Sequence, residues 1–142
     1  MRGWLSLVLL GVCLNVVAQE RVVVCFNYGC ASSTEVVFKR EQLTKIRDLL
    51  EEALDAEHER ALIAVATGRM LAWAGKQSPI WADRGGNLAD GDVHGKMDCI
   101  DHSTTTTRFL RLLENRGWLR WHRVVEPIMR SRFFVAQHWT AV

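Results

Sequence analysis

The sequence has almost no excess of charge of either sign. Its 142 residues carry 18 lysines and arginines against 16 aspartates and glutamates, a net charge of +2, and the two kinds are interspersed. Because nucleic-acid-binding domains need a concentrated basic surface, this balance argues against DNA or RNA as a partner. With 49% hydrophobic and 24% charged residues, the composition is neither disordered nor fibrous. The length predicts a single globular domain.

The sequence also lacks an apolar run of the length that a comfortable membrane span needs, about 20 residues. A shorter apolar stretch lies at residues 4–17, after Arg2, and ends in Val16-Val17-Ala18. This order is typical of a cleaved export signal. We therefore predict a signal peptide over residues 1–18, one domain over residues 19–142 and a periplasmic or secreted location. No stable membrane span would remain after cleavage, and an uncleaved anchor is the alternative.

Cysteine is scarce, with four residues in the whole chain. Cys13 would leave with the signal peptide. Cys25 and Cys30 flank a turn-like segment that can bring their sulfurs together in a disulfide, worth about 2 kcal/mol or less for so short a loop. Cys99 is then an unpaired thiol in an exported protein, which needs an explanation. It is either a buried structural cysteine or a reactive one.

The hydrophobic pattern predicts helices and strands in one α+β domain. Helices are expected over residues 41–55, 57–74 and 99–116, the last ended by Gly117. Strands are expected over residues 21–26, 35–38, 118–125 and 133–142, the last of them central in a sheet because both its faces are apolar. Residues 75–95 form a long loop rich in glycine, aspartate and asparagine, and such loops are often functional.

Cys99 lies where the third predicted helix begins. Asp98 is a suitable N-cap, and Asp101 three residues later resembles a capping box. The free N–H groups and the positive dipole end of a first helical turn lower a thiol pKa and can stabilise an oxyanion. His138, 39 residues later on a predicted strand, can take the thiol proton. This order of residues favours a Cys/His nucleophile pair.

The run Asp98-Cys99-Ile100-Asp101-His102-Ser103, the helix after it, Gly117 and the final His138-Trp139-Thr140-Ala141-Val142 resemble the transglutaminase-like cysteine peptidase superfamily, especially its bacterial exported branch. The resemblance covers roughly residues 41–142. It implies a papain-like α+β fold, in which a helical layer with the nucleophile-bearing helix packs on an antiparallel sheet.

The resemblance further implies Cys99 as nucleophile, His138 as general base, a peptide or protein substrate and no cofactor. Asp98 and Asp101 are possible supporting residues. The third residue of the family is an acidic side chain on the strand after the histidine, and no residue up to Val142 matches it. We therefore expect a chain truncated after the histidine strand.

Two alternatives stay open. Zinc ligands of the right types crowd into nine residues, although without the paired spacing of a structural zinc site: His94, Asp98, Cys99, Asp101 and His102. A catalytically inactive binding or scaffold module of the same fold is the other. The sequence thus favours an exported thiol-dependent amide hydrolase or acyl transferase, and leaves its substrate and its choice between hydrolysis and transamidation open.

Overall fold

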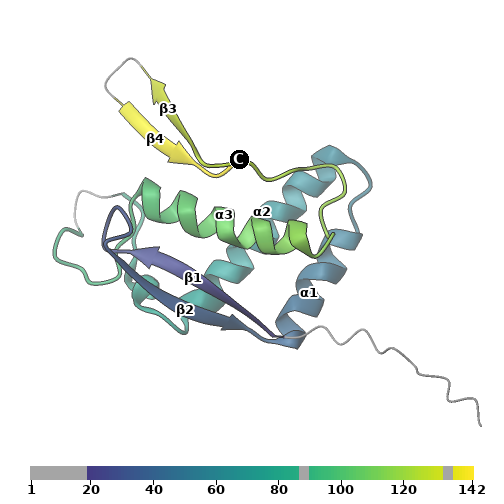
Figure 1. Cartoon of the computed structure of the whole chain (residues 1–142), viewed down its shortest axis with the longest axis horizontal. Coiled ribbons are helices and arrows are strands. Elements are labelled where there is room, and N and C mark those ends of the chain that lie inside the picture. Colours follow the sequence, from purple (N-terminus) through teal and green to yellow (C-terminus); the bar gives the residue numbers. More distant parts are fainter. Residues whose placement is uncertain (1–18, 87–89, 133–135) are drawn as a thin grey trace, which may run out of the picture.

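The computed structural model describes residues 19–86, 90–132 and 136–142, so the predicted signal peptide lies outside the described residues. Within these ranges the chain is a small α+β domain with three α-helices and two small antiparallel sheets, which confirms the predicted class (Figure 1). The helices are α1 (Arg40–Glu51), α2 (Ala56–Gly75) and α3 (Cys99–Asn115), with a short 3-10 helix, η1 (Pro79–Ala82). The strands are β1 (Glu20–Phe26), β2 (Ser32–Phe38), β3 (Ile128–Arg132) and β4 (Ala136–Thr140). None of the helices within the described ranges has the length and apolarity to cross a membrane.

Strands β1 and β2 form a hairpin with one buried face. Their register runs from the pair Glu20 and Phe38 to the pair Phe26 and Ser32. Side chains alternate between the two faces of a strand. Val22, Val24 and Phe26 therefore point into the core, whereas Val23 is exposed. Helices α2 and α3 pack on this hairpin.

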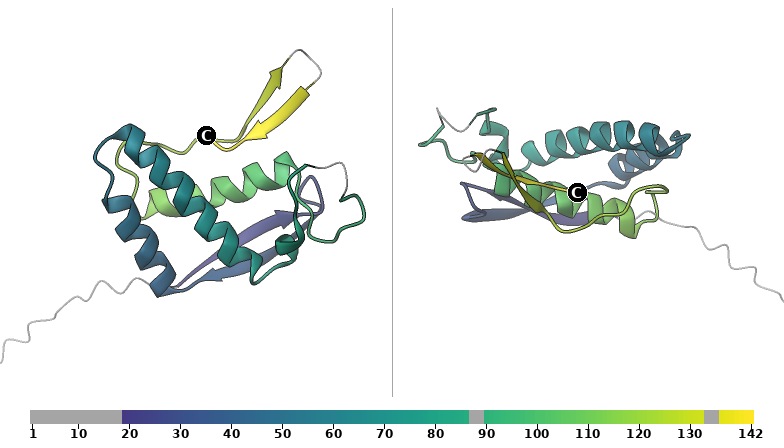
Figure 2. Two further views of the ribbon diagram at one scale, coloured as in Figure 1. Left: turned by 180° about the vertical axis from the view of Figure 1, so that it is seen from behind. Right: turned by 90° about the horizontal axis from the view of Figure 1, so that it is seen from above.

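Helix α3 is the central element of the domain. It lies between the β1–β2 hairpin on one side and the β3–β4 hairpin on the other (Figures 1 and 2). Phe109 and Leu113 are fully buried, and the Phe109 ring meets the Phe38 ring edge-on at 5.3 Å. The apolar Ile100 at the start of the same helix is 38% exposed. Packing by a few large residues thus holds a helix whose four consecutive threonines, Thr104 to Thr107, favour helix formation only weakly.

The segment after α3 differs from the prediction. Residues 118–125 were expected to form a strand, and the structure gives them no strand pairing. Three of their backbone N–H groups donate to one carboxylate instead. Glu59 of α2 is fully buried and accepts hydrogen bonds from the backbone of Arg120 (2.6 Å), Trp121 (2.9 Å) and His122 (2.9 Å). The His122 ring is also bonded to it, at 2.7 Å from Nδ1.

A second carboxylate holds the same segment one step further on. Glu114, in the last turn of α3, accepts a hydrogen bond from the Val124 backbone at 2.9 Å and is paired with Arg111. Beyond it, the Val125 N–H donates to the Val142 carbonyl at 2.9 Å and closes the base of the β3–β4 hairpin. Side-chain acceptors therefore fix the path of the chain toward β3, in a segment that has no strand partner among the described residues.

The hairpin itself is smaller than predicted. The expected strand over residues 133–142 is reduced to β4, and β3 falls in a stretch that was expected to be a connection. Among the described residues β4 pairs only with β3, so the expectation of a central strand is wrong. Its central residues 137–139 are exposed.

The two carboxylates predict acid sensitivity. Burial alone would raise the pKa of Glu59, but its hydrogen bonds from residues 120–122 outweigh that effect and hold the pKa below the usual value. The Val124 N–H, helped by Arg111, likewise lowers the pKa of Glu114. A carboxylate with a lowered folded-state pKa contributes stability that is complete above its unfolded pKa of about 4.3 and is lost as the pH falls through the folded value.

We therefore expect the urea midpoint to be flat near neutral pH and to fall below about pH 4.3. Circular dichroism at a series of pH values measures it. The Glu59→Gln variant, which has lost one of the two groups, should show a shallower acid dependence. An equal acid dependence in the variant and the parent would contradict the assignment.

Candidate active-site cleft at Cys99

The start of α3 is built by two aspartates. Asp98 Oδ1 accepts hydrogen bonds from the backbone of Ile100 (3.0 Å) and Asp101 (2.9 Å), and Asp101 Oδ2 accepts one from the Asp98 N–H (3.1 Å). This arrangement confirms the predicted N-cap and capping box. It fixes Cys99 as the first residue of a 17-residue helix, with a half-buried side chain. Cys99 is also the one free cysteine that the structure describes.

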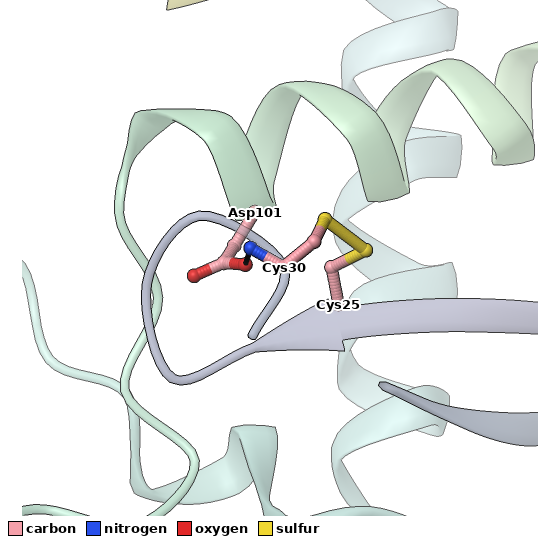
Figure 3. Close-up of side chains that lie close together, drawn as sticks. All are labelled: Cys25, Cys30 and Asp101. Carbon is pink, nitrogen blue, oxygen red and sulfur yellow. Dashed lines mark hydrogen bonds between the residues drawn. A yellow bond between two sulfur atoms is a disulfide. The ribbon is translucent and has the colours of Figure 1, made fainter. Parts of the chain in front are cut away.

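The predicted disulfide is confirmed and closes an unusual turn. Cys25 and Cys30 are bonded, five residues apart in sequence (Figure 3). All four residues from Asn27 to Cys30 have a left-handed backbone, with φ of 67°, 65°, 61° and 56°. Three of the four are not glycine, and such residues adopt this conformation only where other contacts enforce it. Successive N–H groups in a turn of this kind can point together and bind an anionic group.

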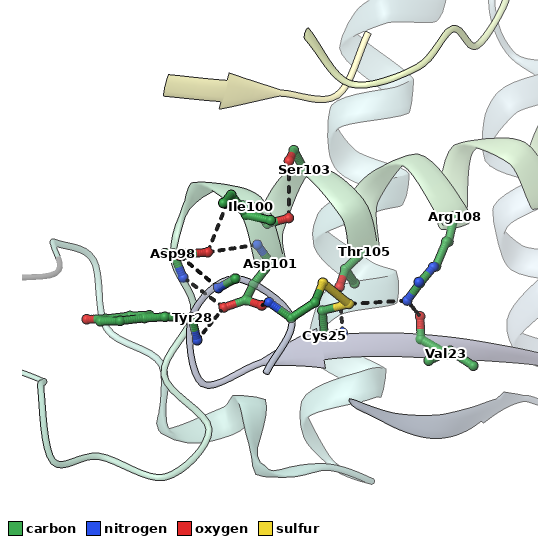
Figure 4. Close-up of a disulfide and its surroundings, with 11 residues drawn as sticks. Val23, Cys25, Tyr28, Asp98, Ile100, Asp101, Ser103, Thr105 and Arg108 are labelled. Carbon is green, nitrogen blue, oxygen red and sulfur yellow. Dashed lines mark hydrogen bonds between the residues drawn. A yellow bond between two sulfur atoms is a disulfide. The ribbon is translucent and has the colours of Figure 1, made fainter. Parts of the chain in front are cut away.

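The anionic groups are Asp101 of α3 and Asp98, the N-cap of that helix. Asp101 accepts hydrogen bonds from the backbone of Tyr28 (2.8 Å) and Cys30 (2.7 Å), and Asp98 accepts one from Gly29 (2.9 Å) (Figure 4). Asp101 is fully buried, and burial raises the pKa of its carboxyl above the usual value although the bound N–H groups oppose this. Both aspartates therefore anchor the disulfide turn to the helix that carries Cys99.

Two further contacts attach the disulfide to α3. The Cys25 N–H donates to Thr105 Oγ1 at 3.0 Å, which gives one of the four threonines a defined role. Arg108 donates to the Val23 carbonyl at 3.0 Å and to Cys25 Sγ at 3.3 Å (Figure 4). The first three turns of α3 are thus fastened to the end of β1.

Cys99 and His138 line the same cleft, which has a volume of about 610 Å³. Its walls are the start of α3, the loop at residues 84–86 and residues 137–141 of β4 and beyond. His138 is exposed and pairs with Arg130 in the register of the hairpin. Within the described ranges no hydrogen bond joins the Cys99 thiol to the His138 imidazole, although both residues line the cleft. Residues far apart in sequence are therefore brought to one surface.

A second imidazole in the cleft was missed as a site residue, except as a possible zinc ligand. His102 lies one helical turn after Cys99, and its Nε2 is 3.0 Å from Asp83 Oδ2. The other oxygen of Asp83 accepts a hydrogen bond from the Met97 N–H at 2.7 Å. Asp83 lies in the long loop, with no sequence motif to connect it to His102. The pair ties this loop to the first turns of α3.

The possible zinc ligands near Cys99 do not converge. In the described part of the chain, one group of three potential ligands lies within 4.8 Å, namely Cys25, Cys30 and Asp101, and two of its members form the disulfide. His94 instead contacts the Asn27 amide at 3.2 Å and the edge of Phe26, while His102 pairs with Asp83. The geometry therefore gives the zinc alternative no support.

No protein-family model, curated protein or solved structure matches the chain. The chemistry of the cleft therefore carries the functional inference.

Proposed function

We propose that the protein is an exported thiol-dependent amide hydrolase or acyl transferase of the transglutaminase-like kind, with Cys99 as nucleophile and His138 as general base. The observation that supports this most is the shared cleft. A thiol at the first position of a long helix and an imidazole on a separate hairpin line one surface. That is the arrangement in which a cysteine nucleophile is activated by a histidine.

The first turn of α3 favours the chemistry in two ways. Its dipole stabilises a negatively charged sulfur, so the proton can pass to His138 and leave a thiolate. Asp98 occupies the N–H groups of Ile100 and Asp101, so in the described structure the Cys99 N–H is the donor of this turn nearest the sulfur without a protein acceptor. When the thiolate attacks a carbonyl carbon, this N–H can stabilise the resulting oxyanion.

The absence of a direct bond between the two groups is compatible with this role. Hydrogen bonds between catalytic side chains are often long before the substrate binds. The packing of α3 against β1 and β4 supports the proposed papain-like arrangement of a nucleophile helix on antiparallel strands. The Cys25–Cys30 disulfide supports an oxidising compartment, such as the periplasm or the extracellular space.

The proposal predicts a lowered thiol pKa. The alkylation rate of Cys99 by iodoacetamide, followed by intact mass from pH 5 to 10, should rise with an apparent pKa below the ordinary value of a free thiol, about 8.5. His138→Ala should raise it toward 8.5 because the imidazolium partner is gone. The half-exposed His58 on α2 provides the matched control, since His58→Ala should leave the profile unchanged.

If Cys99 reacts with the pKa of a free thiol, or not at all in the folded protein, the catalytic proposal is wrong. The same fold would then be better explained as a binding or scaffold module.

A further inference from the structure

A second hollow adjoins the Cys99 cleft. Its volume is about 670 Å³, and it lies between α2, η1 and the start of α3. Its apolar wall includes Leu71, Ile80 and Trp81. Met97 and His102 line this hollow and the Cys99 cleft alike, so the two spaces share a wall.

The shared wall is held in place. The ion pair between His102 and Asp83 and the hydrogen bond from the Met97 N–H to the same aspartate fix its position from both sides. Met97 itself is 2% exposed. A ligand that reaches Cys99 therefore meets a preformed edge, beyond which the apolar hollow begins.

The hollow also contains the most exposed tryptophan of the described residues. Trp81 is 78% exposed. Its backbone lies against Gly75 of α2, since a Cβ added to this glycine would be 3.5 Å from the Cα of Trp81. A large apolar side chain held in the open next to a hollow is a feature of binding sites, because burying it on a ligand is favourable.

We propose that this hollow is a substrate subsite that takes a bulky apolar side chain next to the carbonyl attacked by Cys99. The inference rests on the proposed function and adds to it the class of substrate: an amide or acyl donor with an aromatic or large aliphatic side chain. Continuity with the Cys99 cleft through Met97 and His102 assigns the hollow to this occupant. Among the described residues that line it, Lys76 is the one charged side chain besides the pair of His102 and Asp83.

The test uses haloacetamides that differ only in their side arm. Cys99 in the full chain is alkylated with N-benzyl-iodoacetamide, N-hexyl-iodoacetamide and N-(2-carboxyethyl)-iodoacetamide, and each rate is divided by the rate of glutathione with the same reagent. We expect the two apolar reagents to react at least about tenfold faster than the acidic one after this correction, with saturation. Trp81→Ser should remove most of that preference, and Trp121→Ser, at an exposed tryptophan outside the hollow, should leave it intact.

The outcomes separate the two proposals. Equal corrected rates for all reagents, on a Cys99 with a lowered pKa, overturn the subsite and leave the proposed function standing. A saturable apolar preference that depends on Trp81, on a Cys99 with an ordinary pKa, contradicts the catalytic role and overturns the substrate subsite, leaving an apolar binding site beside Cys99. A preference that survives Trp81→Ser overturns the assignment to this hollow.

Discussion

Glu59→Gln is expected to lower the free energy of unfolding by about 3 kcal/mol, because it breaks a buried charged hydrogen-bond network. The carboxylate accepts four hydrogen bonds, three from the backbone and one from His122. A glutamine has the same shape, but its NH₂ group would point at N–H donors and leave at least one of them buried without an acceptor. Urea unfolding at pH 7, followed by circular dichroism, measures the loss.

Glu57→Gln is the matched control for this substitution. Glu57 lies in the same first turn of α2, so both variants lose one charge near the helix N-terminus, but Glu57 is exposed. Its replacement should change stability by less than about 0.5 kcal/mol. Similar losses in the two variants would show that the buried network has little energetic importance.

Glu59→Gln should also affect the Cys99 cleft. Glu59 holds the segment that leads to the β3–β4 hairpin, and His138 is on that hairpin. In Glu59→Gln we expect faster hydrogen exchange at Trp121 and His122, together with a Cys99 pKa that moves toward that of His138→Ala. Unchanged exchange would mean that the hairpin keeps its position without this carboxylate.

Much of the fold could be predicted because its signals are local. The strands β1 and β2, the three helices and the cap at Asp98 each depend on residues within one turn or one hairpin. The disulfide could be predicted for the same reason, since its cysteines are five residues apart. These elements lie within a few residues of their predicted bounds.

The segment at residues 118–125 could not be predicted in this way. It is rich in aromatic and β-branched residues, which favour strands. Whether such a segment pairs depends on which acceptors reach its N–H groups, and here they come from Glu59, about sixty residues earlier, and from Glu114. A buried carboxylate on a helix has no signature in a hydrophobic pattern, so the sequence does not single out Glu59.

In the candidate site, too, residues with a local sequence signal could be predicted and contacts between distant residues could not. Cys99 could be singled out from the helix start, and His138 from its place on a strand. The pair of His102 and Asp83 joins residues from a helix and a long loop, and only the folded chain brings them together at 3.0 Å. Asp98 and Asp101 were expected to help the cysteine, and the structure shows their carboxylates bound to the disulfide turn. A role for them in catalysis stays a prediction.

Asp101→Asn is expected to lower the free energy of unfolding by about 2 kcal/mol in the protein with its disulfide intact. The buried carboxylate accepts hydrogen bonds from the backbone of Tyr28, Cys30 and Asp98, and an asparagine offers only one oxygen to these three donors. The exposed Asp92 is the control, and Asp92→Asn should have little effect. All variants carry Cys99→Ala, so that no free thiol can exchange with the disulfide during unfolding.

The loss of unfolding free energy caused by Asp101→Asn should depend on the disulfide. Replacing Cys25 and Cys30 by serine should by itself lower stability by about 2 kcal/mol, the entropy of so short a loop. Once the turn is free to open, its N–H groups can reach water, and leaving them without Asp101 costs less. The triple change should therefore be about 1 kcal/mol less destabilising than the sum of its parts. Full additivity in urea unfolding would contradict this coupling and would mean that α3 begins at Cys99 whether or not the disulfide turn is docked on it.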